Sequence, residues 1–250
     1  MDWNRAKTIL IIAFAALNLF LAIQVYQTWE KTLELTDAHN ITLRELEQLM
    51  EEGNIRLDTE LPEVKPDEMI LKATLKNVDD SWEAHDNYFK QTPENPIAVK
   101  DSKEIGTVLE EYVPDFDNYE LDTFSSTSSR YVYQQQWDDL PLFDATLSVQ
   151  LKEKQITSMH WVPFDITEES RSKEAIYSAQ SALFALIERG DIPDGSVISD
   201  IRLGYHGKNY EAQTYDLLPS WRFTIAKGNA FYVNAFYGDV ETVPSVKDKN

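Results

Sequence analysis

The first 26 residues constrain this chain more than any other segment. Residues 8–26 (TILIIAFAALNLFLAIQVY) carry no charged side chain, and Arg5 and Lys7 precede them. A helix of this length is about 28 Å long, close to the roughly 30 Å core of a bilayer. We therefore expect a retained transmembrane helix. The alternative is a cleaved signal peptide, whose apolar region is usually shorter and ends in a small-residue site. The end of this apolar run lacks an A-x-A pattern.

Charges beside the apolar run predict its orientation. Cations favour the cytoplasmic side of a membrane, and both N-terminal cations lie before the run. We expect residues 1–7 in the cytoplasm and residues 27–36 as a juxtamembrane linker or helix. The remainder would then lie outside the cytoplasm, on the extracytoplasmic face of the cell membrane.

The composition of the chain indicates a folded, acidic extracytoplasmic region. Hydrophobic residues make up 42% and aromatic residues 12% of the chain, which predicts a core rather than disorder. Without Asp2, Arg5 and Lys7, 21 cations stand against 42 acids, a net charge of −21. This charge argues against nucleic acid as a partner. The chain has no cysteine, which excludes disulfides, thiol catalysis and zinc–thiolate sites.

Local signals predict the first elements of this region. Thr42 and Glu45 form a T-x-x-E capping box before a helix with leucines at helical spacing, and Gly53 is a natural end for it. Residues 69–78 alternate between apolar and other side chains, which predicts a strand.

Two later segments show the same order of predicted elements. Each runs helix, strand, an aromatic-Asp-x-Leu-Pro string, strand, short turn, strand, and the strings are WDDLP (137–141) and YDLLP (215–219). The predicted helices are 102–113 and 168–189, and the predicted strands are 130–137, 143–151, 155–162, 196–205, 221–226 and 230–237.

Short turns between strands force antiparallel pairing. We therefore expect an α+β fold in which antiparallel sheets are each packed by a helix. The predicted extracytoplasmic subdomains are residues 37–166 and 167–250, as two related helix-plus-sheet units.

No motif in the chain supports catalysis. The four histidines are far apart in sequence, and H-E-x-x-H, phosphate-binding glycine loops and G-x-S-x-G are absent. Asp115, Asp117 and Asn118 resemble part of a calcium loop, but the glycine and the terminal glutamate are not in register. We predict that the protein is not an enzyme and has no catalytic residues, metal or cofactor.

One polar residue lies inside the apolar segment. Asn18 lies mid-span, and Phe14, Ala15, Ala22 and Val25 share its face of a helix. Small residues let a second helix approach closely, and an amide can hydrogen-bond across the contact. These five residues are a candidate transmembrane partner contact. The alternative is an asparagine that is simply tolerated in an apolar span.

Three large aromatic residues lie in the polar stretch 79–96. Trp82, Tyr88 and Phe89 could form an exposed extracytoplasmic contact surface. Alternatively, these side chains cap the core.

The N-terminal segment MDWNRAKTILIIAFAALNLFLAIQVYQ resembles the start of YycI (WalI) proteins of low-GC Gram-positive bacteria. The shared features are the MDW start, the basic residues before the span and the Asn18-Leu19 pair. The segments YVYQQQWDDLPLFDATL and LPSWRF…FYVNAFYGDVE are also similar to that family.

The resemblance implies a single-pass membrane protein with an extracytoplasmic domain of duplicated helix-plus-sheet units. It also implies action with a YycH-like partner on the sensor histidine kinase YycG (WalK). This kinase belongs to a two-component regulatory system for signal transduction that controls cell-wall metabolism. In that family, transmembrane helices carry much of the contact with the kinase.

The resemblance favours a non-enzymatic regulator, and two alternatives stay open. One is an anchored PepSY-like binding or protease-inhibitory module, for which the soluble domain would suffice. The other is a cell-wall enzyme that uses carboxylates. Exchange of residues 8–26 for an unrelated span separates the regulator from the anchored module.

Overall fold

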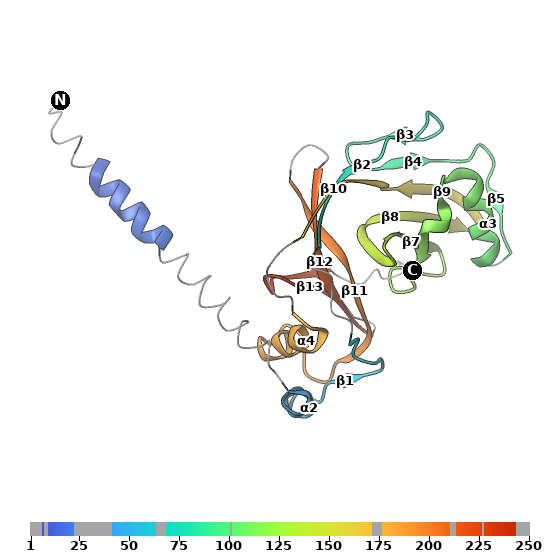
Figure 1. The fold of residues 1–250 in the computed structure, drawn as a ribbon. Coiled ribbons are helices and arrows are strands. Elements are labelled where there is room, and N and C mark those ends of the chain that lie inside the picture. Colours follow the sequence, from blue (N-terminus) through green and yellow to red (C-terminus); the bar gives the residue numbers. More distant parts are fainter. Residues whose placement is uncertain are drawn as a thin grey trace.

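The computed structural model describes residues 7, 10–22, 42–63, 69–100, 102–171, 177–210, 214–226 and 228–243. The described part is a mixed α+β fold dominated by β-sheet (Figure 1). The predicted fold class is therefore confirmed at the level of α+β.

The strands form two groups, which we call sheet A and sheet B. Sheet A contains β1 (Arg56–Leu57), β2 (Met69–Leu75), β10 (Phe164–Arg171), β11 (Val197–Tyr210), β12 (Thr214–Ile225), β13 (Ala230–Asn234) and β14 (Val240–Val243). Sheet B contains β3 (Glu83–Ala84), β4 (Phe89–Gln91), β5 (Ile97–Ala98), β6 (Tyr119–Leu121), β7 (Arg130–Trp137), β8 (Leu140–Lys152) and β9 (Gln155–Trp161). The two groups meet where Tyr205 of β11 pairs in parallel with Leu142 of β8.

Helices cover the two sheets. Helices α2 (Leu43–Glu52) and α4 (Ala179–Glu188) pack on each other, and both contribute to one core with sheet A, which includes the fully buried Trp221. Helix α3 (Ser102–Tyr112) and the short helix η2 (Phe116–Asn118) contribute to a second core with sheet B. The site described below lies where sheet A meets sheet B.

The predicted capping box at the start of α2 is confirmed. The Glu45 backbone N–H donates to the Thr42 hydroxyl oxygen at 3.3 Å, and the Thr42 backbone N–H donates to the Glu45 carboxylate at 2.7 Å. Together these bonds satisfy two N–H groups that a helix start leaves unpaired. The cap holds α2 so that Leu46 is buried against α4.

The second long helix predicted from the sequence is shorter than expected. The prediction of helix over 168–189 is wrong at its start, because β10 extends to Arg171 and α4 begins at Ala179. Pairing of β10 with β2 accounts for the strand. The side chain of Ser178 caps α4 by accepting the Ser181 backbone N–H at 3.1 Å.

The two aromatic-Asp-x-Leu-Pro strings do not occupy equivalent positions. Asp138 and Asp139 form the tight turn between β7 and β8, with φ of 47° and 62°. Aspartate is among the non-glycine residues that adopt this left-handed conformation most readily. In contrast, YDLLP lies inside β12, and Pro219 stands where that strand changes its partner from β2 to β13.

Strands from both sides of residue 166 share sheet A, since β2 pairs with β10 and with β12. The proposed division into residues 37–166 and 167–250, and the relation between the two units, stay predictions. The order of elements agrees in part between the two proposed units. Helix α3 precedes the antiparallel strands β7, β8 and β9, and helix α4 precedes the antiparallel strands β11, β12 and β13.

Residues 10–22 form a helix, drawn in blue in Figure 1. Within the parts of the chain that the structure describes, no helix has both the length and the apolar character needed to cross a membrane. The predicted linker 27–36 and Val25 of the predicted contact face lie outside the described residues.

Candidate functional site

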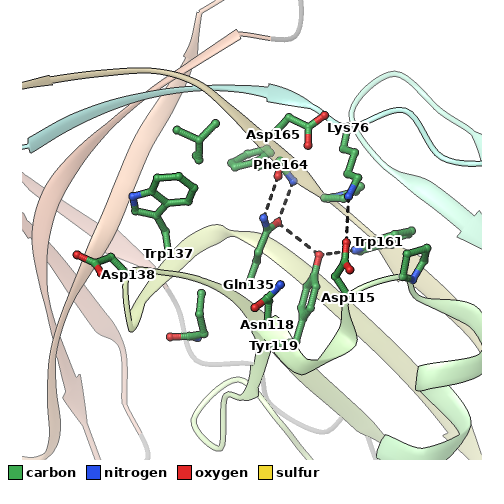
Figure 2. A pocket seen from close by; sticks show the side chains of 14 residues that line it. Lys76, Asp115, Asn118, Tyr119, Gln135, Trp137, Asp138, Trp161, Phe164 and Asp165 are labelled. Atoms are coloured by element: carbon green, nitrogen blue, oxygen red, sulfur yellow. Dashed lines mark hydrogen bonds and ion pairs between the residues drawn. The ribbon is translucent and has the colours of Figure 1, made fainter.

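A pocket of about 430 Å³ lies at the junction of the two sheets (Figure 2). The end of β7, helix η2 and the end of β9 supply the residues from sheet B, and the start of β10 and the residue after β2 supply those from sheet A. The lining residues are Lys76, Pro114, Asp115, Asn118, Tyr119, Gln135, Gln136, Trp137, Asp138, Trp161, Pro163, Phe164, Asp165 and Ile166. Its volume falls within the range of small-molecule sites.

A chain of hydrogen bonds links the buried lining residues. The Trp161 indole N–H donates to the Tyr119 hydroxyl oxygen at 2.8 Å, and the Tyr119 O–H donates to Gln135 Oε1 at 3.3 Å. Burial raises the pKa of Tyr119, so its hydroxyl stays protonated and keeps its role as donor.

The Gln135 side chain connects β7 to β10. Its Nε2 donates to the Phe164 carbonyl at 2.8 Å, and its Oε1 accepts the Phe164 backbone N–H at 2.9 Å. An amide side chain can make this pair of bonds because it carries the same donor and acceptor as a peptide group. The Gln135 side chain therefore bonds to the Phe164 backbone as an adjacent β-strand would.

Charged groups lie around the rim of the pocket. Lys76 Nζ is 3.6 Å from the Asp115 carboxylate, and in Figure 2 this pair lies on the opposite side of the Gln135–Tyr119 chain from Trp137 and Asp138. Asp138 and Asp165 are exposed. Of the four charged lining residues, three are acidic, so the pocket disfavours anions.

The pocket lining contains no histidine, serine, threonine or cysteine, so it holds no serine–histidine or cysteine–histidine pair. Among the described residues, no group of three or more histidine or acidic side chains is placed to hold a metal.

The predicted aromatic contact residues divide between core and surface. Trp82 and Phe89 are buried in the core of sheet B. The ring centroids of Trp82 and Trp161 are 5.0 Å apart. Tyr88 is partly exposed, and its ring stacks between those of His85 at 4.5 Å and His160 at 5.4 Å. Of the three, Tyr88 is therefore the one that offers surface to a partner.

The predicted membrane-contact residues lie on the described N-terminal helix, Val25 excepted. The side chains of Phe14, Ala15, Asn18 and Ala22 are exposed. Among the described residues no helix that could span a membrane is present against which this face could be tested, and the contact stays a prediction.

The pocket was not predicted from the sequence, because its lining comes from segments far apart in the chain. The sequence did contain one signal, since the QQQ run at 134–136 places three consecutive polar residues in the predicted strand 130–137. Gln134 is buried, Gln135 bridges to β10, and Gln136 lines the pocket.

Comparison with protein families finds a match over residues 36–236 to the family described as YycI protein. A comparison with curated proteins found no match. Among solved structures, an uncharacterized protein from Eubacterium rectale ATCC 33656 is similar at 11% identity and a TM-score of 0.37, over 63% of each chain. The chain therefore spans under two thirds of that protein. The Bacillus megaterium YpeB C-terminal domain is similar at 11% identity and a TM-score of 0.35, over 81% of this chain and 98% of the other.

Proposed function

Because the chain belongs to the YycI family, we propose that it is a membrane-anchored, non-enzymatic regulator of a YycG (WalK)-like sensor histidine kinase, acting with a YycH-like protein. The family is a regulatory one and indicates a role in the YycG/WalK two-component system. The match over residues 36–236 is the observation that carries this proposal. Control of cell-wall metabolism would follow from the kinase that is regulated.

Regulation by a partner requires a difference in affinity. A partner that binds both signalling states of a kinase equally shifts nothing, however tightly it binds. Coupling free energies of about 1–3 kcal/mol are typical. The protein would therefore bind one state of the kinase several-fold to about a hundredfold more tightly.

We place one contact with the kinase in the membrane, with the N-terminus in the cytoplasm and the folded region outside it. The helical conformation of residues 10–22 supports this contact, since it brings Ala15, Asn18 and Ala22 to one face. Phe14 and Val25 would flank them. An interhelical hydrogen bond from the asparagine would contribute roughly 0.6–2 kcal/mol.

We place a second contact on the extracytoplasmic surface around Tyr88. The ring stack of His85, Tyr88 and His160 joins the turn between β3 and β4 to β9 of sheet B. Trp82 and Phe89 support this surface from the core. Aromatic residues with a partly exposed face and a polar atom are common in protein interfaces.

Affinity capture from solubilised membranes tests the proposal. The full-length protein should capture the sensor kinase, and a version with an unrelated apolar helix at residues 8–26 should not. Asn18→Leu should reduce the captured kinase several-fold while leaving membrane insertion intact. Phe20→Leu is the matched control, because residue 20 lies on the opposite face of the helix.

Three results would contradict parts of this proposal. Absence of the kinase from every capture would remove the functional meaning of the family assignment. Equal capture by the native and exchanged spans would remove the membrane contact. If the exported region alone captured and inhibited an extracellular protease, the anchored inhibitory module would replace the regulator.

A further inference from the structure

The chemistry of the junction pocket points to a ligand site: we propose that it binds a neutral saccharide of mono- or disaccharide size. This inference goes beyond the proposed regulation and does not rest on it. Its basis is the pocket volume of about 430 Å³, one aromatic side wall and a lining of unpaired hydrogen-bonding groups.

Trp137 supplies the aromatic side wall. Its side chain is partly exposed and lines the pocket at the end of β7, beside Asp138 (Figure 2). Within the described residues, no ring stacks on this indole and no group accepts a hydrogen bond from its N–H. The flat apolar face of an indole suits the apolar face of a sugar ring, and its N–H can donate to a hydroxyl oxygen.

Several acceptors in the lining have no partner. Asp138 and Asp165 form no ion pair or side-chain hydrogen bond within the described part of the chain. Gln136 uses its Nε2 to donate to the Gln134 carbonyl at 3.1 Å, and no bond to its Oε1 occurs there. An acceptor-rich surface requires a ligand with several donors, and each sugar hydroxyl is one.

The same lining also presents donors, which favours a saccharide over a cation. The Asn118 side-chain amide makes no hydrogen bond within the described residues, and the Trp137 N–H is likewise available. Ammonium groups donate but cannot accept, whereas hydroxyl groups do both. The positive charge of Lys76 is balanced by Asp115, whose carboxylate lies 3.6 Å away. This pair would therefore attract neither an anion nor a second cation strongly.

The floor of the pocket is already in place before a ligand arrives. Trp161, Tyr119, Gln135 and the Phe164 backbone form one connected set of hydrogen bonds. A preformed site loses less affinity to the ordering of side chains on binding. A small ligand could therefore bind Trp137, Asp138 and Asp165 without breaking these hydrogen bonds.

Isothermal titration calorimetry on the full-length protein tests this site. The detergent must lack a sugar headgroup, because a glucoside or maltoside would compete. Cellobiose, maltose and N,N′-diacetylchitobiose are the saccharide probes, and tri-lysine is the cationic probe. At least one disaccharide should bind, with an affinity that does not change between low and high salt, since a neutral ligand is not screened.

Variants locate the binding in the pocket. Asp165→Asn should weaken saccharide binding about tenfold, as expected for a lost hydrogen bond to a charged acceptor. Trp137→Ala should weaken it at least tenfold, and Trp137→Phe should restore part of the affinity because it keeps an aromatic face. Tyr237→Ala is the matched control, because this aromatic residue is 45% exposed and lies outside the pocket lining.

Three outcomes would overturn the proposal. The first is that none of the disaccharides binds the native protein. The second is that Asp165→Asn and Trp137→Phe both bind as well as the native protein does, with unfolding midpoints unchanged. The third is that tri-lysine alone binds and is displaced by salt, which would make the pocket a cation site. No kinase is present in the assay, so its failure leaves the regulatory proposal untouched.

Discussion

Replacing Asp122 with asparagine should destabilise the protein strongly, because it leaves a buried cation without its counter-charge. Arg222 of β12 is 0% exposed and Asp122 is 1% exposed. Their two hydrogen bonds, Nη1 to Oδ2 at 2.9 Å and Nη2 to Oδ1 at 3.1 Å, join sheet A to sheet B. Burial alone lowers the pKa of Arg222, but Asp122, together with Tyr232 and Asp200, raises it, so the net pKa is raised.

The size of the effect follows from what remains around the guanidinium. Loss of one partner of a buried ion pair costs about 3–5 kcal/mol. Asp200 stays 3.3 Å from Nη2, and the Phe143 ring centroid lies 5.1 Å from Arg222 Cζ. This partial compensation places Asp122→Asn near the lower end, about 3 kcal/mol. At roughly 2–4 °C per kcal/mol for a chain of this size, the melting temperature should fall by about 6–12 °C.

A double-mutant cycle identifies the charge as the cause. Arg222→Met removes the uncompensated cation, so the double variant should be more stable than the sum of the two single effects, by about 1–3 kcal/mol. Urea unfolding followed by tryptophan fluorescence measures all four proteins. Asp117→Asn, at an exposed aspartate in η2, is the control and should stay within about 0.5 kcal/mol of the native protein. A cost below about 1 kcal/mol for Asp122→Asn, or strictly additive effects, would refute the reasoning.

Two further changes test the sheet junction and its surroundings. A Cβ at Gly204 would lie 2.5 Å from the Pro141 carbonyl oxygen and 2.7 Å from the Phe143 ring. Gly204→Ala should therefore lower the free energy of unfolding by about 1–3 kcal/mol. Gly106→Ala in α3, with its nearest atom 3.7 Å away, should be neutral or slightly stabilising, and equal urea midpoints for both variants would contradict this. Burial lowers the pKa of His206, but bonds to Asp144 at 3.1 Å and Glu241 at 3.3 Å outweigh it, so the net pKa is raised. A raised pKa means that the stability from this cluster is complete below about pH 6.5 and is lost as the pH rises through the folded-state pKa. Unfolding midpoints should fall over that range in the native protein and less in His206→Asn, and parallel pH profiles would disprove the assignment.

Features that depend on neighbours in the chain could be predicted from the sequence. The capping box of Thr42 and Glu45 involves residues three apart. The predicted strand 130–137 is β7, which contains Tyr131, Val132 and Tyr133, residue types that favour strands. The start of the second long helix could not be predicted in this way. Residues 164–171 form a strand because β2, about 90 residues earlier, provides the edge with which they pair. Long-range pairing of this kind overrides local preference.

The pocket shows the same limit more sharply. Lys76, Asn118, Gln135 and Asp165 are far apart in sequence and become neighbours only when sheet A meets sheet B. Their individual roles also depend on geometry, since Gln135 serves as a strand neighbour and not as a solvent-exposed polar residue. The partial calcium-loop pattern did contain two rim residues, Asp115 and Asn118. Its physical basis was nevertheless different, because Asp115 pairs with Lys76.

Both the pocket and the buried ion pair involve residues that connect sheet A to sheet B. Gln135 ties β7 to β10, and Asp122 with Arg222 ties the end of β6 to β12. A ligand in the pocket alters the binding of a kinase only if its own affinity differs between the free and the kinase-bound protein. Reciprocity then requires that the kinase change the saccharide affinity by the same factor. Calorimetry of the saccharide with and without the kinase therefore distinguishes a ligand that regulates from one that only stabilises the fold.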